Sequence, residues 1–322
     1  MADLDQSRGG DIVAIGIDVG GTKILGVVAG RDGRPIHRLK TATPRDPAAV
    51  PLAIGDAVEQ LLDRVGPVAG VGVGVPGLVD NDGVLRYGPN VPGVVGFDVP
   101  AVIGARFELP VVAENDASCA AVAEHRLGAA RGHDHAVVVT QGTGIGGGLI
   151  VNGALLRGTN GFAGEPGHML VDRSGPVCAC GTRGCWEAVA SGAGLANLAR
   201  QLVAEGRAGR IVALAGGDPG HIRGEHVAAA LAGGDPDAGE VLDSFASWVA
   251  QGLASLINLL DPGIIVLGGG LTLLSEHFLP DVQARTVGAV LGGAHRPVVP
   301  VVAAELGPEA GAVGAALLAI DG

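Results

Sequence analysis

Two glycine-rich loops constrain the fold of this chain more than any other feature of its sequence. The first, at residues 18–23 (DVGGTK), follows a run rich in Ile and Val at residues 11–17. The second, at residues 142–148, follows another apolar run at residues 136–140. After each loop the residues again favour a strand, so both loops are predicted to lie inside β-hairpins. One such hairpin in each half of the chain indicates two related lobes that hold a nucleotide between them.

The residues of the first loop suit a phosphate group. Gly20 and Gly21 let backbone amides approach an anion closely, while Thr22 adds a hydroxyl and Lys23 a positive charge. Asp18 precedes the loop and can hold Mg²⁺ directly or through water. The spacing is not that of a Walker A loop, and a plain hairpin turn remains an alternative interpretation.

The second loop contains Gly142, Thr143 and Gly144 and satisfies the pattern Gly-x-Gly-x-x-Gly. A Rossmann dinucleotide site requires that such a loop open a helix. Here the chain continues as a strand, an Asn-Gly turn and a second strand at residues 149–156, which argues against that site. A third glycine turn, residues 268–270, ends a predicted strand and would permit the close approach of a flat ligand.

Asp116 is the candidate catalytic residue. It follows Asn115 at the junction between a predicted strand, residues 110–113, and a predicted helix, residues 117–127. A carboxylate at the carboxyl end of a strand lies where α/β proteins bind ligands, and it can take a proton from a substrate hydroxyl. The alternative is structural, because Asn and Asp are favoured residues at helix N-termini.

Three cysteines within eight residues, Cys178, Cys180 and Cys185, predict a metal site with His168, which lies ten residues before the first of them. Three thiolates and an imidazole suit tetrahedral structural Zn²⁺. Clustered thiols in a reducing compartment favour metal over disulfides, and buried free thiols are the alternative.

Composition excludes several classes of function. The chain has 322 residues, enough for two domains, with 48% hydrophobic and only 2% aromatic residues. A net charge of −12 gives no basic footprint for nucleic acid and no basic helix for a membrane surface. The first ten residues lack the apolar core of a signal peptide, and no apolar run is long enough to span a bilayer. We therefore expect a cytoplasmic protein.

From about residue 11 to its end, the chain resembles the ROK sugar kinases, and among them the bacterial ROK glucokinases. The segments that carry this resemblance are residues 18–23 and 142–148 as the phosphate motifs, 114–117 as the segment of the catalytic Asp, 268–270 as the adenosine motif, and 178–187 as the zinc signature Cys-x-Cys-Gly-x-x-Gly-Cys-x-Glu. The zinc signature is matched in full. The chain departs from the usual family pattern at Ser118, Gln141 and Pro166, which bears on the identity of the sugar more than on the reaction.

The resemblance implies an α/β fold of the actin-like, hexokinase type (ribonuclease H-like), with two lobes and an active-site cleft between them. The small lobe would comprise residues 1–113, completed by a C-terminal helix at residues 309–322. The large lobe would comprise residues 114–308 and carry the zinc site and a dimerisation surface. A homodimer or homotetramer is expected.

The resemblance also assigns roles to individual residues. Asp116 would be the general base on the O6 hydroxyl of the sugar. His168 would serve twice, with one ring nitrogen on zinc and the other facing the sugar. The residues expected to bind the sugar are Asn90, Asn115, Asp116, Glu165, His168 and Glu187. Those expected to bind ATP and its Mg²⁺ are Asp18, Gly20, Gly21, Thr22, Lys23, Gly142, Thr143, Gly144, Gly268, Gly269 and Gly270. Those expected to bind structural Zn²⁺ are His168, Cys178, Cys180 and Cys185.

The implied activity is ATP-dependent phosphorylation of glucose at O6. The alternatives within this class are kinases for N-acetylmannosamine, N-acetylglucosamine, fructose or allose. A sugar-sensing repressor of the same family would need an N-terminal helix-turn-helix domain, for which only about ten residues precede the first strand. A polyphosphate-dependent kinase is a further alternative, and the zinc signature argues against it.

Overall fold

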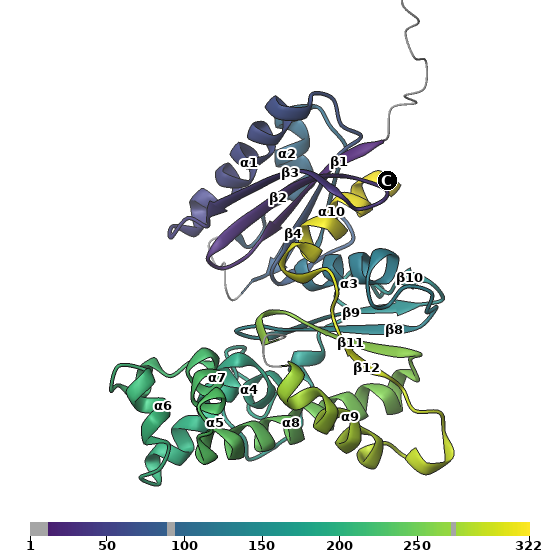
Figure 1. Ribbon diagram of the computed structural model, residues 1–322. Coiled ribbons are helices and arrows are strands. Elements are labelled where there is room, and N and C mark those ends of the chain that lie inside the picture. The colour runs from purple at the N-terminus through teal and green to yellow at the C-terminus, as the bar shows by residue number, and fades with distance from the viewer. Residues whose placement is uncertain (1–11, 89–93, 272–274) are drawn as a thin grey trace, which may run out of the picture. The chain divides into compact units, whose positions relative to one another are not determined.

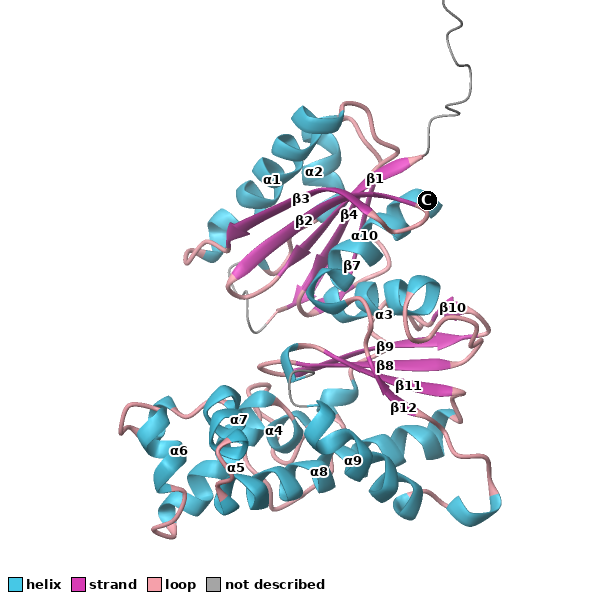
Figure 2. Cartoon of the chain, viewed as in Figure 1, coloured by secondary structure: helices cyan, strands magenta, loops and turns pink. Residues whose placement is uncertain are grey.

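The computed structural model of the protein describes residues 12–88, 94–271 and 275–322. The contacts between residues divide the chain into two compact units (Figures 1 and 2). Unit 1 comprises the chain up to Leu127, the segment Arg157–Ala163 and the C-terminal segment Glu309–Gly322. Unit 2 comprises Gly128–Leu156 and Gly164–Pro308.

Unit 1 is built on a five-stranded sheet in the order β3-β2-β1-β4-β7. The strands β1, β2 and β3 pair antiparallel, while β1, β4 and β7 pair parallel. Strands β5 and β6 form a separate two-stranded ribbon. The bounds of the strands are β1 Val13–Val19, β2 Lys23–Gly30, β3 Pro35–Ala42, β4 Val71–Val75, β5 Leu78–Val79, β6 Leu85–Tyr87 and β7 Val111–Asn115.

In the described part of unit 1, four α-helices pack on the two faces of this sheet. Their bounds are α1 Val50–Val65, α2 Val99–Phe107, α3 Asp116–Leu127 and α10 Ala310–Asp321. Figure 2 shows α1 and α2 on one face, and α3 and α10 on the other. A Cβ built on Gly16 of β1 or Gly72 of β4 would lie 1.9 Å from a carbonyl oxygen of α10, so both positions require glycine for the helix to lie against the sheet.

Unit 2 repeats the strand arrangement of unit 1. Its sheet has the order β10-β9-β8-β11-β12, in which β8, β9 and β10 pair antiparallel and β8, β11 and β12 pair parallel. The bounds are β8 Ala136–Gln141, β9 Ile145–Val151, β10 Ala154–Leu155, β11 Ile264–Gly268 and β12 Val301–Ala303. In each unit, a hairpin therefore continues into parallel strands by way of helical crossovers.

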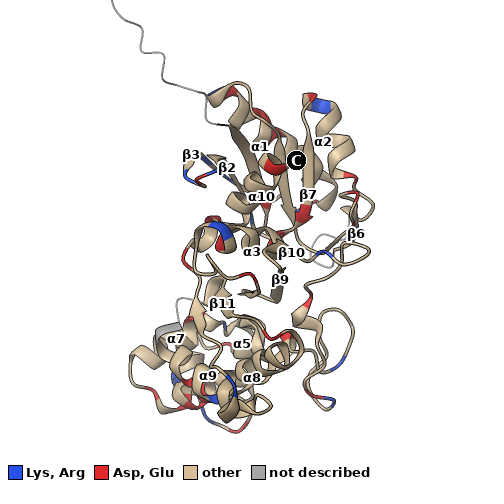
Figure 3. Cartoon of the chain, turned by 90° about the vertical axis from the view of Figure 1, so that its right-hand side faces the viewer, with Lys and Arg blue, Asp and Glu red and all other residues tan. Residues whose placement is uncertain are grey.

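The helices of unit 2 enclose a second apolar core around Trp186, Phe245 and Phe278. The bounds are α4 Glu187–Ala190, α5 Gly192–Ala204, α6 Gly209–Leu214, α7 Gly224–Ala232, α8 Pro236–Leu260 and α9 Ser275–Ala289. Short 3₁₀ helices among the described residues are η1 Pro47–Ala49, η3 Pro166–His168, η4 Pro219–His221, η6 Gly293–His295 and η7 Gly307–Glu309. In the view of Figure 3, Lys and Arg are seen in both units.

The structure corrects some of the expected element boundaries. The strand expected at residues 110–113 is β7, which continues to Asn115, and the following helix already begins at Asp116. The glycine-rich composition of residues 206–219 favours a loop, yet this segment contains α6, because Ile211 supplies an apolar contact to the core of unit 2. The predicted border between lobes at residue 113 differs from the division by contacts, which assigns α3 to unit 1. The two-lobe boundaries stay a prediction.

None of the helices among the described residues has the length and hydropathy that a bilayer-spanning helix requires.

Candidate functional site

The first glycine loop is the turn of the hairpin between β1 and β2, as predicted. The backbone N–H of Gly20 donates to the carbonyl of Lys23 at 2.9 Å. The Thr43 hydroxyl donates to the Gly20 carbonyl at 2.6 Å and so holds the turn against the next strand. Gly21 and Thr22 are exposed at the tip, where their backbone and hydroxyl groups are accessible to an anion.

Asn115 and Asp116 lie at the junction of β7 and α3. The Asn115 side-chain oxygen accepts a hydrogen bond of 3.0 Å from Ser118 N–H, which is the bond of a helix N-cap. Its amide nitrogen donates to the carbonyl of Gly77 at 3.1 Å. Asp116 Oδ1 accepts from Ala117 N–H at 2.8 Å. The helix-capping role that the sequence allows for this pair therefore belongs to Asn115. Asp116 follows it, and its carboxylate is half-buried at the end of the strand.

The charge of Asp116 acts electrostatically on Asp18. Burial, and secondarily the charge of Asp116, raises the pKa of Asp18 to about 7, while Lys23 acts in the opposite direction. Burial likewise raises the pKa of Asp116. The carboxylate of Asp18 thus lies within electrostatic range of Asp116, and a carboxylate oxygen is a ligand that Mg²⁺ accepts.

The predicted metal ligands converge in unit 2. The donor atoms of His168, Cys178, Cys180 and Cys185 all lie within 4.8 Å of one another. The sulfurs of Cys180 and Cys185 are 3.7 Å apart, and Nδ1 of His168 is 3.8 Å from the sulfur of Cys178. With Zn–S bonds of about 2.3 Å, a tetrahedral site separates two sulfurs by about 3.8 Å. The donor set and its spacing therefore fit a structural zinc ion.

The C-terminal end of the ligand loop is fixed by packing. Trp186 follows the last cysteine, is fully buried, and donates from Nε1 to the carbonyl of Trp248 at 2.8 Å. Its ring lies so close to Gly252 of α8 that a Cβ there would be 2.0 Å from it. Gly184 has a φ of 83°, and a Cβ there would meet the carbonyl of Asp172 at 1.7 Å. These contacts hold the ligand loop in one conformation.

The predicted sugar residues of unit 2 adjoin the metal cluster. Nε2 of His168 lies 3.9 Å from a carboxylate oxygen of Glu165, while Nδ1 faces the cysteines. Glu187 opens α4, and its Oε2 accepts from Ile145 N–H at 2.8 Å. The sulfur of Cys178 lies 3.3 Å from Oε1 of Glu187. Glu187 thus connects the cluster to the second glycine loop.

The second and third glycine loops pack against each other in unit 2. Gly142 N–H donates to Gly144 O at 2.9 Å, which closes the turn between β8 and β9. Gly269 has a φ of 87°, and a Cβ there would lie 2.5 Å from the carbonyl of Gln141. The Gln141 side chain donates to the carbonyl of Ala190, so this departure from the family pattern anchors the loop to α4.

Pro166, which like Gln141 departs from the usual family pattern, lies in η3 against β9. It is buried, and a Cβ on Gly147 would come within 2.6 Å of its ring. The proline therefore fills the space that the glycine-rich strand leaves open, next to Glu165 and His168.

The site residues are thus divided between the two units. Unit 1 contains the first loop, Asp18, Asn115 and Asp116, and unit 2 contains the other two loops, Glu165, His168, Glu187 and the metal cluster. Asn90 lies outside the described residues. Glu114 and Arg157, to which the sequence motifs assign no role, form an ion pair at the position two residues before Asp116. No local pattern signals this pair, because 43 residues separate its members.

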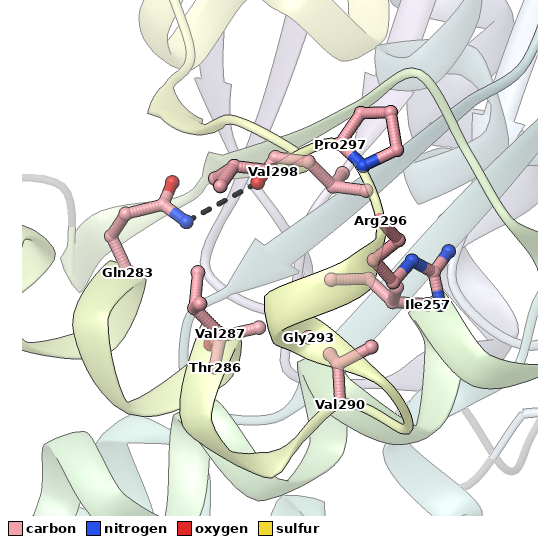
Figure 4. Close-up of a pocket in the computed structure, with 10 residues that line it drawn as sticks. Ile257, Gln283, Thr286, Val287, Val290, Gly293, Arg296, Pro297 and Val298 are labelled. Atoms are coloured by element: carbon pink, nitrogen blue, oxygen red, sulfur yellow. Dashed lines mark hydrogen bonds between the residues drawn. The ribbon is translucent and has the colours of Figure 1, made fainter.

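A pocket elsewhere in unit 2 contains none of the predicted site residues. It lies among α8, α9 and η6, encloses about 250 Å³ that includes open solvent, and is lined mostly by aliphatic side chains such as Val287 and Val298 (Figure 4). It is smaller than a typical ligand pocket.

Comparison with known proteins identifies the family. The ROK family model matches residues 14–322. A glucokinase of Streptomyces coelicolor is 39% identical over 311 residues, which cover 95% of this chain and 97% of that protein. An N-acetylmannosamine kinase of Escherichia coli O157:H7 is 33% identical over 314 residues, which cover 96% of this chain and 98% of that protein.

Among solved structures, this chain is similar to a ROK family glucokinase from Streptomyces griseus in complex with glucose and AMPPNP. The TM-score is 0.86 at 38% identity, covering 96% of this chain and all of that one. This similarity confirms the predicted actin-like, hexokinase-type fold. The match of the family model over nearly the whole chain, together with these relatives, shows that the chain belongs to the ROK family.

Proposed function

We propose that this protein phosphorylates glucose at O6 with ATP as the phosphoryl donor. The observation that carries the proposal is the placement of Asp116 at the end of β7, with Asn115 taking over the capping of α3. Similarity to glucokinases over almost the whole chain, including one crystallised with glucose and an ATP analogue, supports the same reaction.

In the proposed mechanism, Asp116 acts as the general base. Its carboxylate takes the proton of the O6 hydroxyl while O6 forms a bond to the γ-phosphorus of ATP. The bond from this phosphorus to the β,γ-bridging oxygen breaks, and ADP leaves with the bonding electrons. The products are glucose 6-phosphate, ADP and the proton carried by Asp116. A pKa raised by burial favours the uptake of this proton.

The sugar would be oriented by hydroxyl contacts from Asn115, Glu165, His168 and Glu187. Glu165 and His168 already lie side by side, with the imidazole Nε2 turned toward the carboxylate. Orientation is worth many orders of magnitude in a two-substrate reaction, so these residues would act mainly on the positioning of O6. Asn90 belongs to this proposed set on its sequence motif alone.

ATP would be held by the glycine loops. Exposed backbone at Gly21 and Thr22, with the ammonium of Lys23, would contact phosphate oxygens, as would residues 142–144 of the second loop. Residues 268–270 would lie against the adenosine. Mg²⁺, held through Asp18, would neutralise charge on the phosphates.

Zinc would have a structural role. Its four proposed ligands include His168, so the ion would fix the imidazole and leave Nε2 for the sugar. It would also stiffen the segment that leads to Glu187.

A kinase for N-acetylmannosamine is the second candidate, because a relative with that name is 33% identical over nearly the whole chain. The chemistry at Asp116 would be the same for either sugar. A cytoplasmic location and a homodimeric or homotetrameric assembly remain predictions.

The proposal is tested by measuring ADP release with Mg-ATP over glucose, mannose, fructose, allose, N-acetylglucosamine and N-acetylmannosamine. We expect the highest kcat/KM with glucose. A higher kcat/KM with an N-acetylated sugar would support the same mechanism but show that this sugar, and not glucose, is the preferred substrate. Folded, zinc-loaded protein that turns over no sugar would refute the proposed function.

A further inference from the structure

An arginine outside the predicted site is paired with a buried carboxylate two residues before Asp116. Nε of Arg157 lies 2.7 Å from Oε2 of Glu114, whose side chain is only 7% exposed. Arg157 opens the loop of residues 157–163, which belongs with unit 1 although the segments on either side belong to unit 2. The ion pair therefore joins this loop to the end of β7.

The second oxygen of Glu114 supports the backbone that leads to Asp116. Oε1 accepts a hydrogen bond of 3.0 Å from the N–H of Asn115. Asn115 in turn caps α3 through its side-chain bond to Ser118. One carboxylate thus binds the arginine and the peptide group of the residue before Asp116, and hydrogen bonds to charged groups are the stronger kind.

The loop that carries Arg157 is anchored independently of this ion pair. Nδ2 of Asn81 donates to the carbonyl of Thr159 at 2.8 Å. Gly161 has a φ of 89°, and a Cβ there would lie 2.6 Å from the carbonyl of Val79. Ala163 N–H donates to the carbonyl of Arg157 at 3.0 Å. The backbone at Arg157 is therefore held in place, and its guanidinium is presented to Glu114 from a fixed position.

We propose that Arg157 is a positioning residue for phosphoryl transfer, because it keeps Glu114 buried and bonded to the backbone next to Asp116. The inference rests on the proposed function. Burying a carboxylate without its cation partner is costly, so without Arg157 the side chain of Glu114 would turn toward water. This movement would break the bond to Asn115 N–H and loosen the position of Asp116.

The test compares Arg157→Ala, Arg157→Lys and the double variant Arg157→Ala/Glu114→Gln with the wild type. Misplacement of a reacting group by about 1 Å can cost a factor of roughly 100, so we expect kcat of Arg157→Ala to fall by about 10- to 100-fold. KM for ATP should stay within about twofold, because the glycine loops are untouched. Arg157→Lys should retain part of kcat, since an ammonium also neutralises Glu114.

The double variant gives the decisive measurement. The Gln side chain is neutral, and its amide oxygen can still accept from Asn115 N–H without a cation nearby. Glu114→Gln should therefore raise kcat in the Arg157→Ala background by at least about fivefold. If Arg157 only held its loop in place, adding Glu114→Gln would not raise kcat.

Arg106→Ala is the matched control, because Arg106 also pairs with carboxylates of unit 1, Asp56 and Glu59, on the helical face formed by α1 and α2. We expect its kcat to stay within about twofold of wild type, as for residues remote from a site. Arg157→Ala with a kcat as high as that of this control would overturn the proposal. So would a double variant no faster than Arg157→Ala alone.

Amide hydrogen exchange at Asn115 tests the same link without turnover. Exchange should be faster in Arg157→Ala than in the wild type or Arg106→Ala, and unchanged exchange would overturn the positioning role. A wild type without sugar kinase activity would remove the proposed function, whereas faster exchange at Asn115 would still support the link through Glu114. If Arg157→Ala does not fold, Arg157→Lys provides the same comparison.

Discussion

The side-chain oxygen of Asn115 accepts a hydrogen bond of 3.0 Å from the backbone N–H of Ser118. This bond makes Asn115 the cap of α3. From the sequence alone, helix capping could involve either Asn115 or Asp116; the structure assigns capping to Asn115, and the proposed role of base remains with Asp116. Asp116, the first residue of the helix, is then a carboxylate whose removal need not unfold the helix terminus. The two residues should respond differently to substitution.

Asp116→Asn should abolish most of the activity without loss of the fold. The variant keeps a side-chain oxygen for Ala117 N–H but cannot take the proton of O6. We expect kcat to fall by about 10²- to 10⁴-fold, with KM for the sugar changed only slightly. Steady-state kinetics with Mg-ATP would measure this, and a kcat within tenfold of wild type would remove Asp116 as the base.

Asn115→Ala should lower stability, because it deletes the cap of α3 and the bond to Gly77. We expect a loss of about 1–2 kcal/mol in the free energy of unfolding, measured by urea denaturation. Asp116→Asn serves as the control, since it leaves the cap in place and replaces a buried carboxylate with a neutral side chain, so it should not lower this free energy. Equal destabilisation by both variants would contradict the separation of roles.

Cys180→Ser should lose the metal. Removal of one thiolate leaves three donors for an ion that structural sites bind with four. We expect zinc, measured by atomic emission spectrometry, to fall from stoichiometric to near zero. Tm should fall by roughly 5 °C or more, as for a loss of about 2 kcal/mol in a domain of this size. Cys119→Ala, which alters a buried cysteine of unit 1, should leave the zinc content unchanged.

Gly72→Ala should be strongly destabilising. The added Cβ would lie 1.9 Å from the carbonyl of Ala315, so α10 would have to move away from the sheet. We expect a loss of about 3 kcal/mol or more. Gly239→Ala is the matched control in α8, where nothing lies within 4 Å, and it should gain up to about 1 kcal/mol. Thermal denaturation of both variants would measure the contrast.

Asp18→Asn should stabilise the protein at neutral pH in the absence of ATP and Mg²⁺. The pKa of Asp18 is raised to about 7, so the folded state binds a proton that the unfolded state has already released. Stability due to this group is therefore present at pH 4 and is lost as pH rises to 7. The gain from Asn should grow over this range and level off at no more than about 4 kcal/mol. Tm measured from pH 4 to pH 8 tests the sign, and a gain that shrinks with rising pH would contradict it.

Much of the candidate site can be predicted from the sequence because its signals are local. The glycine hairpins, the Asn115-Asp116 junction and the Cys-x-Cys-x₄-Cys spacing each depend on residues close together in the chain. Backbone freedom at glycine, the capping preference of Asn and the ligand chemistry of Cys act over such short distances. These local rules, with the resemblance that the motifs carry, determined the fold class, the family and the candidate residues.

Only the tertiary structure decided how these pieces are supported. The pairing of Arg157 with Glu114, the burial of Trp186 against Gly252, and the contact of Gly269 with Gln141 join residues far apart in sequence. Helix α6 likewise forms in a segment whose glycines predict a loop, because Ile211 is buried in the core of unit 2. Such contacts depend on the packing of whole elements, which the order of residues along one segment does not encode.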